Sequence, residues 1–201
     1  MIGIVNYGLG NVDAFINIYN LLGKKIIKID NSDDLKKIDH IIIPGVGAFD
    51  NAMNLLTKTD FFEMLSFRVT KEKIPTLGVC VGMQIMGSES EEGNEKGLDW
   101  IPGSVVSLKN FSNKLRIPHM GWNTVRISPD AKLFKDIEDP QFYFLHSYFF
   151  KPLDKKFTIS ETEYGIEFSS AIQNDNILAT QFHPEKSHKW GIKLLENFAS
   201  I

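Results

Sequence analysis

The first half of the sequence alternates between short apolar runs and stretches with helical periodicity. The apolar runs cover residues 2–6, 25–29, 41–43 and 74–79, and the third of them is expected to end at Pro44. Helices are expected between them over residues 12–22, 33–37, 48–56 and 61–71. Strands that alternate with helices form parallel sheets covered on both faces, with functional groups at the carboxyl ends of the strands. The sequence therefore predicts an α/β fold with an open, mostly parallel sheet and helices on both faces.

Short strand-like runs replace this alternation from residue 98 onwards. Strands are expected near residues 105–108, 142–144, 157–159, 169–173 and 177–181, before a closing helix over residues 190–198. The chain has 201 residues, 43% of them apolar, which is enough for one sizeable core, and it shows no repeat or linker. We therefore expect a single domain over residues 1–201, with additional antiparallel strands in its second half.

Cys80 is the only cysteine of the sequence, and it lies where the strand of residues 74–79 meets a helix expected over residues 81–86. Gly78 and Gly82 flank it, and glycine allows the tight turn that makes a nucleophile project from a strand end. Nearby N–H groups can then stabilise an oxyanion, and a helix N-terminus favours the thiolate. The alternative interpretation is a buried structural cysteine.

A histidine and a carboxylate follow the last expected strand. His183 and Glu185 lie in residues 181–187 (QFHPEKS), directly after the apolar run of residues 177–180. Most His-x-Glu pairs are solvated loop residues, but here a candidate nucleophile precedes the pair. The order Cys80, His183, Glu185 is that of a triad in which a thiolate attacks, an imidazole moves the proton and a carboxylate orients the imidazole.

These two motifs resemble the signatures of the class I, triad-type glutamine amidotransferases, G-x-C-x-G-x-Q and H-P-E. Within that family the chain resembles the glutaminase subunits of imidazole glycerol phosphate synthase, through residues 6–11, 44–49, 118–123 and 143–148. The resemblance runs through the whole chain. It implies a flavodoxin-like fold and hydrolysis of L-glutamine to glutamate and ammonia. It also implies a heterodimer with a synthase (cyclase) subunit, a (β/α)₈ barrel that uses the ammonia in histidine biosynthesis.

Two backbone N–H groups are candidates for the oxyanion site. The N–H of Val81 is the natural first donor because it directly follows the nucleophile. The resemblance implies that the second donor comes from the loop of residues 44–47, with Val46 as the favoured residue. Gly45 and Gly47 would allow a peptide there to flip between a donor and a non-donor state. The alternative for this loop is an ordinary tight turn after a strand.

The resemblance also assigns a substrate cleft. Gln84, one helical turn beyond the nucleophile, would hold the α-amino-acid end of glutamine. Glu92 would pair with the substrate ammonium, although the acidic run around it also has the pattern of a solvated face. His146, Ser147 and Tyr148 would line the cleft and contribute hydrogen bonds rather than chemistry.

A partner-facing surface is the last assignment that the resemblance implies. It would include His119, Met120, Trp122, Asn123 and Lys186. Met120 and Trp122 would offer apolar contacts to the synthase, and Lys186 would offer a charged one. The alternative for Trp122 is packing in the core.

Other functions stay open at this stage. The same glutaminase could serve another synthase, such as one that amidinates a surface sugar, because Asn6 and residues 11–15 depart from the usual family pattern on the N-terminal surface. The glutaminase of vitamin B6 synthesis is disfavoured by residues 118–123. A thiol hydrolase or peptidase is disfavoured by Gln84 and the loop of residues 44–47. An inactive scaffold subunit is disfavoured by the complete set of triad residue types.

Composition and charge argue against several further classes. The net charge is −3 and the pI about 6.0, so neither nucleic acid nor a membrane is expected as a partner. The chain enters a strand directly at its start, has no apolar run of about 20 residues, and cannot form an internal disulfide, which together favour the cytoplasm. Residues 8–10 (GLG) lack the third glycine of a dinucleotide fingerprint, and the five histidines lack metal-site spacing. We expect no cofactor and no metal.

Overall fold

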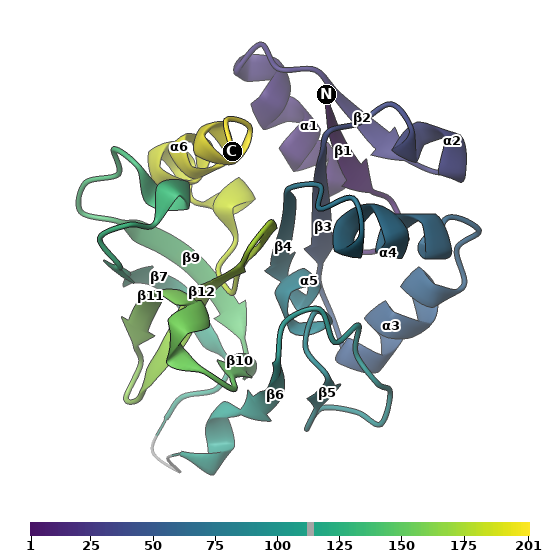
Figure 1. Cartoon of the computed structure of the whole chain (residues 1–201). Helices are drawn as coiled ribbons and strands as arrows, with labels where there is room; N and C mark the ends of the chain where they lie inside the picture. Colours follow the sequence, from purple (N-terminus) through teal and green to yellow (C-terminus); the bar gives the residue numbers. More distant parts are fainter. Residues whose placement is uncertain (112–114) are drawn as a thin grey trace.

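The computed structural model describes residues 1–111 and 115–201 (Figure 1). The helices are α1 (Val12–Leu21), α2 (Ser32–Leu35), α3 (Phe49–Thr57), α4 (Phe62–Thr70), α5 (Val81–Gln84) and α6 (His188–Phe198). The strands are β1 (Ile2–Val5), β2 (Ile26–Ile29), β3 (His40–Gly45), β4 (Thr76–Cys80), β5 (Glu89–Ser90), β6 (Gly103–Ser107), β7 (His119–Thr124), β8 (Arg126–Ile127), β9 (Gln141–His146), β10 (Tyr148–Pro152), β11 (Thr158–Glu163), β12 (Glu167–Asn174) and β13 (Ile177–Thr180). Short 3₁₀ helices follow at η1 (Leu108–Asn110), η2 (Lys132–Phe134), η3 (Lys155–Phe157) and η4 (Pro184–Lys186).

The largest sheet combines strands from both halves of the chain in the order β2-β1-β3-β4-β13-β12-β11-β8. From β2 to β13 neighbouring strands are parallel, in the order of flavodoxin-like doubly wound folds. The strands β12, β11 and β8 extend the sheet in antiparallel fashion. Figure 1 shows α1 and α6 on one side of the parallel strands and α3 and α4 on the other. The predicted α/β fold with a mostly parallel sheet is confirmed.

The second half of the chain adds two small sheets, β10-β6-β5 and β7-β9. The strand expected over residues 105–108 ends earlier, because Leu108 opens the 3₁₀ helix η1. The strand expected over residues 157–159 begins only at Thr158, because Asp154 accepts a hydrogen bond from the N–H of Lys156 and winds η3 before it. The sequence pattern therefore located these strands but misplaced their ends.

Two further boundaries differ from expectation near the cleft. β3 runs through Pro44 to Gly45, which lies opposite Cys80, because a proline lacks only the N–H and its carbonyl still accepts, here from the hydroxyl of Tyr7 at 2.6 Å. The helix expected over residues 81–86 ends at Gln84. The carbonyl of Ile85 accepts instead from the N–H of Leu98, and that of Met86 accepts from the N–H groups of residues 100 and 101, which pull the chain out of the helix.

The core beneath the cleft is built from strands without an exposed face. β1, β4 and β13 are buried along their whole length, as parallel strands covered by helices on both faces must be. Phe142 on β9 stacks on Phe182, which follows β13, with ring centroids 4.0 Å apart. This contact joins β9 to the end of β13, directly before His183.

Candidate active site

A cleft of about 280 Å³ opens at the carboxyl ends of β3 and β4. Its lining brings together ten of the residues singled out from the sequence: Val46, Gly47, Cys80, Val81, Gln84, Glu92, His146, Ser147, Tyr148 and His183. Pro118 and Leu145 complete the wall. Gly45 and Glu185 do not line the cleft themselves. Gly45 packs against Val81, and Glu185 forms a hydrogen bond with His183, and both of these partners belong to the lining. Segments from both halves of the chain thus converge on one cavity.

Cys80 occupies a strained turn between β4 and α5. Its backbone has φ 55° and ψ −110°, a conformation that residues with a side chain rarely adopt. The turn packs tightly on β3, because a Cβ added at Gly82 would lie 2.0 Å from the carbonyl oxygen of Ile43. Only glycine fits there, as the flanking glycines indicated. Since α5 is a single turn, its dipole is small, and charge stabilisation at the sulfur must come mainly from side chains.

His183 lies between the thiol and a buried carboxylate. Its Nδ1 donates to Oε1 of Glu185 at 2.9 Å, and the two side chains are 3% and 2% exposed. The N–H of His183 donates to the carbonyl of Tyr143 on β9 at 2.9 Å, which fixes the backbone. Because Glu185 occupies Nδ1, the other ring nitrogen is left for Cys80, which lines the same cleft.

The protonation of His183 follows from these contacts. Burial by itself would lower the pKa of the imidazole, but the hydrogen bonds and charges of Cys80 and Glu185 outweigh burial and raise the pKa to about 10. His183 is therefore an imidazolium at neutral pH. A thiolate–imidazolium pair is a nucleophile that needs no further base, and the arrangement can carry acyl transfer.

Two neutral histidines connect the cleft to β7. His146 donates from Nδ1 to the carbonyl of Tyr148 at 2.9 Å, so its Nε2 is an acceptor. That Nε2 lies 2.9 Å from Nδ1 of His119, which must donate. Nε2 of His119 in turn lies 3.3 Å from the side-chain amide of Asn123. Burial lowers the pKa of His119 to about 4, and burial together with the neighbouring His119 lowers that of His146 to about 3. Each histidine thus has one fixed tautomer.

This pair predicts a loss of stability in weak acid. The unfolded histidines bind protons near the usual pKa of 6.5, whereas the folded ones do not until about pH 4. The unfolded state therefore binds more protons in this window, and the free energy of unfolding should fall as the pH falls from 6.5 to 4. Urea unfolding at pH 7, 6, 5 and 4 measures it.

One variant distinguishes the contribution of His119 and His146 to this pH dependence from that of the other titrating groups. His119→Phe keeps the stacking on Phe144 and Tyr164 but should reduce the pH slope in this window. Carboxylates with a lowered pKa also contribute to the slope below about pH 5, but they are the same in the variant and the parent chain, so the comparison cancels them: Asp33, Asp34, Asp39 and Asp154. An equal slope in the variant and the parent chain would contradict the assignment.

The substrate-binding residues already have contacts within the protein. Both amide hydrogens of Gln84 are engaged, by the carbonyl of Tyr148 at 2.9 Å and by Oε1 of Gln181 at 3.3 Å, so its own carbonyl oxygen is the group left for a ligand. Oε2 of Glu92 accepts from the N–H of Phe49 at 2.9 Å, at the start of α3. The sequence did not indicate this cap on α3, and it explains how a residue from the acidic run reaches the cleft.

The residues expected to face the partner divide into exposed and buried ones, as the alternation of side chains along a strand requires. Met120 is 59% and Trp122 44% exposed, so core packing does not apply to Trp122. Lys186 is exposed, and its Nζ lies 5.9 Å from the ring centre of Tyr143. His119 is only 2% exposed, and the placement of its side chain on the surface is wrong. Successive residues of a strand face opposite sides, so His119 points inward where Met120 points outward.

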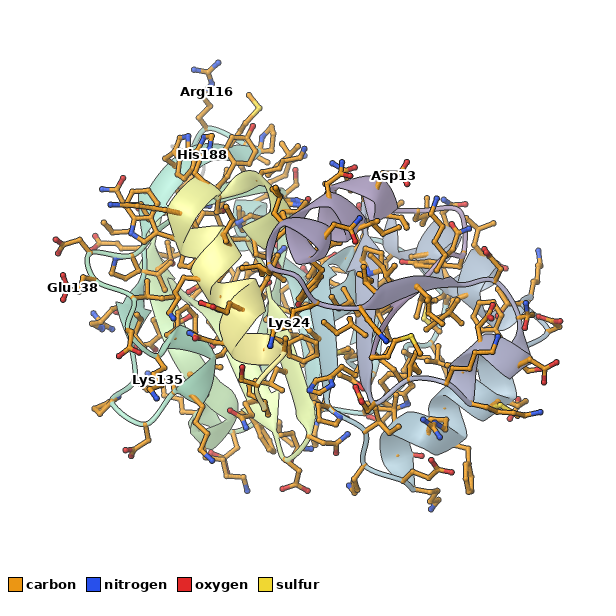
Figure 2. All side chains as sticks on the ribbon, turned by 90° about the horizontal axis from the view of Figure 1, so that it is seen from above. Asp13, Lys24, Arg116, Lys135, Glu138 and His188 are labelled. Atoms are coloured by element: carbon orange, nitrogen blue, oxygen red, sulfur yellow. The ribbon has the colours of Figure 1, made fainter. Side chains whose placement is uncertain are left out.

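An aromatic rim continues this surface beyond β7. Trp122 stacks on His188, with ring centroids 5.3 Å apart and planes at 8°. Figure 2 shows His188 and Arg116 near the same edge of the molecule, with the side chain of Arg116 directed outward. Asn123, also assigned to this surface, is half-buried and donates to the carbonyl of Glu163 at 2.9 Å.

Comparison with known proteins places this cleft in a family. The family model described as glutamine amidotransferase class-I matches residues 6–200. Proteins named imidazole glycerol phosphate synthase subunit HisH, from Bdellovibrio bacteriovorus and Methanocaldococcus jannaschii, are 46% and 44% identical over 204 and 203 residues, covering 100% of both chains in each comparison. The chain belongs to the class I glutamine amidotransferases. Members of this family are enzymes that hydrolyse glutamine.

Solved structures share the class I amidotransferase fold. PurLQS from Thermotoga maritima superposes with a TM-score of 0.73 at 14% identity, covering 99% of this chain and 97% of that one. A structure described as a glutamine amidotransferase gives 0.72 at 16% identity, covering 97% and 98%. These similarities concern the fold alone.

Tyr7 contacts this amidotransferase cleft without having been singled out by the sequence. It is buried and donates to the carbonyl of Pro44, just before the proposed oxyanion loop. Burial, and then the charge of Cys80, raise the pKa of the phenol far above its usual range. The resemblance of residues 6–11 to the family was the one signal in the sequence that could have pointed to Tyr7. It drew attention to this N-terminal turn but gave the tyrosine no role.

Within residues 1–111 and 115–201, no cluster of three or more histidine, cysteine, aspartate or glutamate side chains is arranged to hold a metal ion. In the same part of the chain, no helix combines the length and apolar character that crossing a bilayer requires.

Proposed function

We propose that this chain is the glutaminase subunit of imidazole glycerol phosphate synthase, which hydrolyses L-glutamine in the cytoplasm and supplies ammonia for histidine biosynthesis. The observation that carries the proposal is the convergence of Cys80, His183 and Gln84 on one cleft, with Glu185 hydrogen-bonded behind His183. The full-length similarity to subunits named HisH supports the pathway.

The geometry supports a two-step acyl transfer. The thiolate of Cys80 attacks the side-chain amide carbon of glutamine, and the carbonyl electrons move onto oxygen. The imidazolium of His183 protonates the departing nitrogen, ammonia leaves, and a thioester remains. The now neutral His183 takes a proton from water and becomes an imidazolium again, and the hydroxide attacks the thioester. The tetrahedral intermediate collapses to the thiolate and glutamate, whose carboxyl proton passes to solvent. Glu185 holds the Nδ1–H tautomer throughout.

Stabilisation of the oxyanion falls to two backbone groups in this proposal. The N–H of Val81 follows the nucleophile, and that of Val46 lies in the neighbouring loop, where Gly47 has φ 93°. Such a backbone allows a peptide flip that adds or removes one donor. Because one donor is worth about 10²–10³-fold in rate, this flip suffices to keep a lone subunit nearly inactive until the synthase binds.

The partner in this proposal is a (β/α)₈-barrel synthase subunit, and the assembly is a heterodimer. Met120, Trp122 and Lys186 supply apolar and charged contacts, and Met120 pairs with Leu145, which lines the cleft. His119 and Asn123 support this surface from behind through their hydrogen bonds to each other. Ammonia would leave the cleft directly into the partner.

A reconstituted complex tests the proposal. The chain is mixed with an imidazole glycerol phosphate synthase cyclase subunit, and product formation is measured with glutamine or with an ammonium salt as nitrogen source. Cys80→Ala should lose the glutamine route and retain the ammonium route, because the nucleophile acts before ammonia reaches the synthase. Equal loss of both routes, or no complex with this synthase, would contradict the proposed function.

An alternative is that the chain serves a different synthase, and the names of two relatives favour keeping this alternative. Relatives from Methanococcus maripaludis and Pseudomonas aeruginosa, 46% and 38% identical, are both named subunit HisH 2. The numeral indicates that some organisms carry more than one such chain. In the alternative, the same glutaminase serves a related synthase that amidinates a sugar, and the reconstitution separates the two by which synthase glutamine can support.

A further inference from the structure

Gln181 is a buried side chain that the chemistry above does not use. It follows β13 by one residue, precedes His183 by two, and is 0% exposed. Its Nε2 lies 3.8 Å from Sγ of Cys80, within reach of an N–H···S hydrogen bond. Its Oε1 lies 3.3 Å from Nε2 of Gln84. The amide thus links the nucleophile to a substrate-binding residue, within a region closed to water.

A backbone carbonyl determines which end of this amide faces the sulfur. The carbonyl of Tyr148 can only accept, so the group of Gln84 that lies 2.9 Å from it must be the NH₂. The same NH₂ faces Gln181, which must therefore present its oxygen there and its NH₂ to Sγ. Reversal would place two donors face to face and point a carbonyl oxygen at the thiolate. The chain Tyr148, Gln84, Gln181 accordingly directs an N–H at the nucleophile.

We propose that the side-chain amide of Gln181 stabilises the thiolate of Cys80 and holds Sγ beside His183, an inference that rests on the proposed glutaminase function. A hydrogen bond to a charged acceptor in a buried site is stronger than one between neutral groups. It favours the thiolate over the thiol before substrate binds, so its effect belongs to the free enzyme as well as to the reaction.

The second contact of the sulfur shows why such a donor is needed. Sγ also lies 3.8 Å from the carbonyl of Leu145, which accepts from a thiol S–H but repels a thiolate. α5 is too short to offset this with its dipole. Apart from His183, Gln181 is the side chain that donates to the sulfur among the described residues. The carbonyl of Leu145 therefore favours the thiol, whereas the amide of Gln181 favours the thiolate, which is the reactive form of Cys80.

The pH dependence of thiol alkylation measures this effect directly. Cys80 is the only cysteine, so the mass added by iodoacetamide to the full chain reports on this thiol alone. Gln181→Met keeps the side-chain volume and removes the donor. We expect the midpoint of the alkylation profile to rise by about one pH unit or more, since a hydrogen bond to a charged group has about that effect. In the reconstituted complex, kcat for glutamine should fall about 10- to 100-fold.

Other titratable groups near the sulfur stay unchanged in this comparison. They are His183 and, around the cleft, Tyr7, His146 and Glu92. The matched control is Gln173→Met on β12, whose amide donates to the carbonyl of Asp175 away from the thiol. It should leave the alkylation midpoint unchanged. Circular dichroism of each variant confirms that the fold is retained.

A second variant keeps the test decisive if Gln181→Met folds poorly. Gln181→Glu retains the shape and the acceptor for Gln84 but places a carboxylate oxygen at the thiolate. Its alkylation midpoint should rise further than that of Gln181→Met. An unchanged midpoint in both variants, with only KM for glutamine raised, would overturn the proposal and limit Gln181 to orienting Gln84. Failure of the parent complex to use glutamine would instead count against the glutaminase function.

Discussion

Cys80→Ala is expected to lower glutamine hydrolysis by at least about 10³-fold while the fold and the partner surface stay intact. The substitution removes the only thiol of the chain from a cleft that Gln84 and His183 also line. The backbone N–H groups of the site can still bind an oxyanion, but the variant has no nucleophile to attack the amide carbon of glutamine. Alanine fits the volume of the site, so stability should change little.

The measurement compares glutamine hydrolysis by the complexes of the parent and variant chains. A glutamine-analogue affinity label should add mass to the parent chain on the peptide that contains Cys80 and none to the variant. Cys80→Ser provides a second variant that keeps the polar contacts of the side chain. Glutamine turnover by either variant near the parent rate would rule out Cys80 as the nucleophile.

Glu185→Gln should lower kcat about 10²–10⁴-fold, the range found when the orienting carboxylate of a triad is replaced. The side chain of Glu185 is only 2% exposed, so bulk water has little access to its 2.9 Å contact with His183. A glutamine amide can present its NH₂ to Nδ1 and select the wrong tautomer. The substitution also removes the negative charge of Glu185, which helps to raise the pKa of His183.

The pH profile of kcat/KM distinguishes this role from a structural one. The imidazolium of His183 is lost on the alkaline side, where the pKa is about 10 in the parent chain. In Glu185→Gln the alkaline limb should move to lower pH, because one of the causes that raise this pKa has gone. Glu138→Gln is the matched control, since Figure 2 shows Glu138 at the periphery of the molecule, pointing outward. An unmoved alkaline limb in Glu185→Gln would contradict the assignment.

The sequence predicted the local features because they depend on neighbouring residues. A short helix was expected over residues 33–37, and Oδ1 of Asn31 caps α2 by accepting from the N–H groups of Asp33 and Asp34 at 3.0 and 3.2 Å. The flanking glycines of Cys80 predicted a tight turn, and Gly82 indeed touches β3 too closely for any side chain. Such features need no knowledge of distant segments.

Expectations failed where a distant segment decides the outcome. The helix after Cys80 stops at Gln84 because residues 98–101 capture the carbonyls that would continue it. For Glu92 the acidic run left two interpretations open, and the hydrogen bond to the start of α3 could not be foreseen from the run itself. His119 was assigned to the surface from its motif, whereas the alternation of β7, visible only once the strand is established, directs it inward.

The sequence by itself determined the parallel α/β order, the elbow at Cys80 and the residue types of the cleft, because apolar periodicity, glycine spacing and family motifs are local properties. Only the tertiary structure decided which polar groups meet. The pairing of His119 with His146, and the amide chain from Tyr148 through Gln84 and Gln181 to Cys80, join residues from β4, β7, β9, β10, α5 and the segment that follows β13. A buried polar side chain needs a partner, and the partner is chosen by how the strands pack rather than by what lies beside it in the sequence.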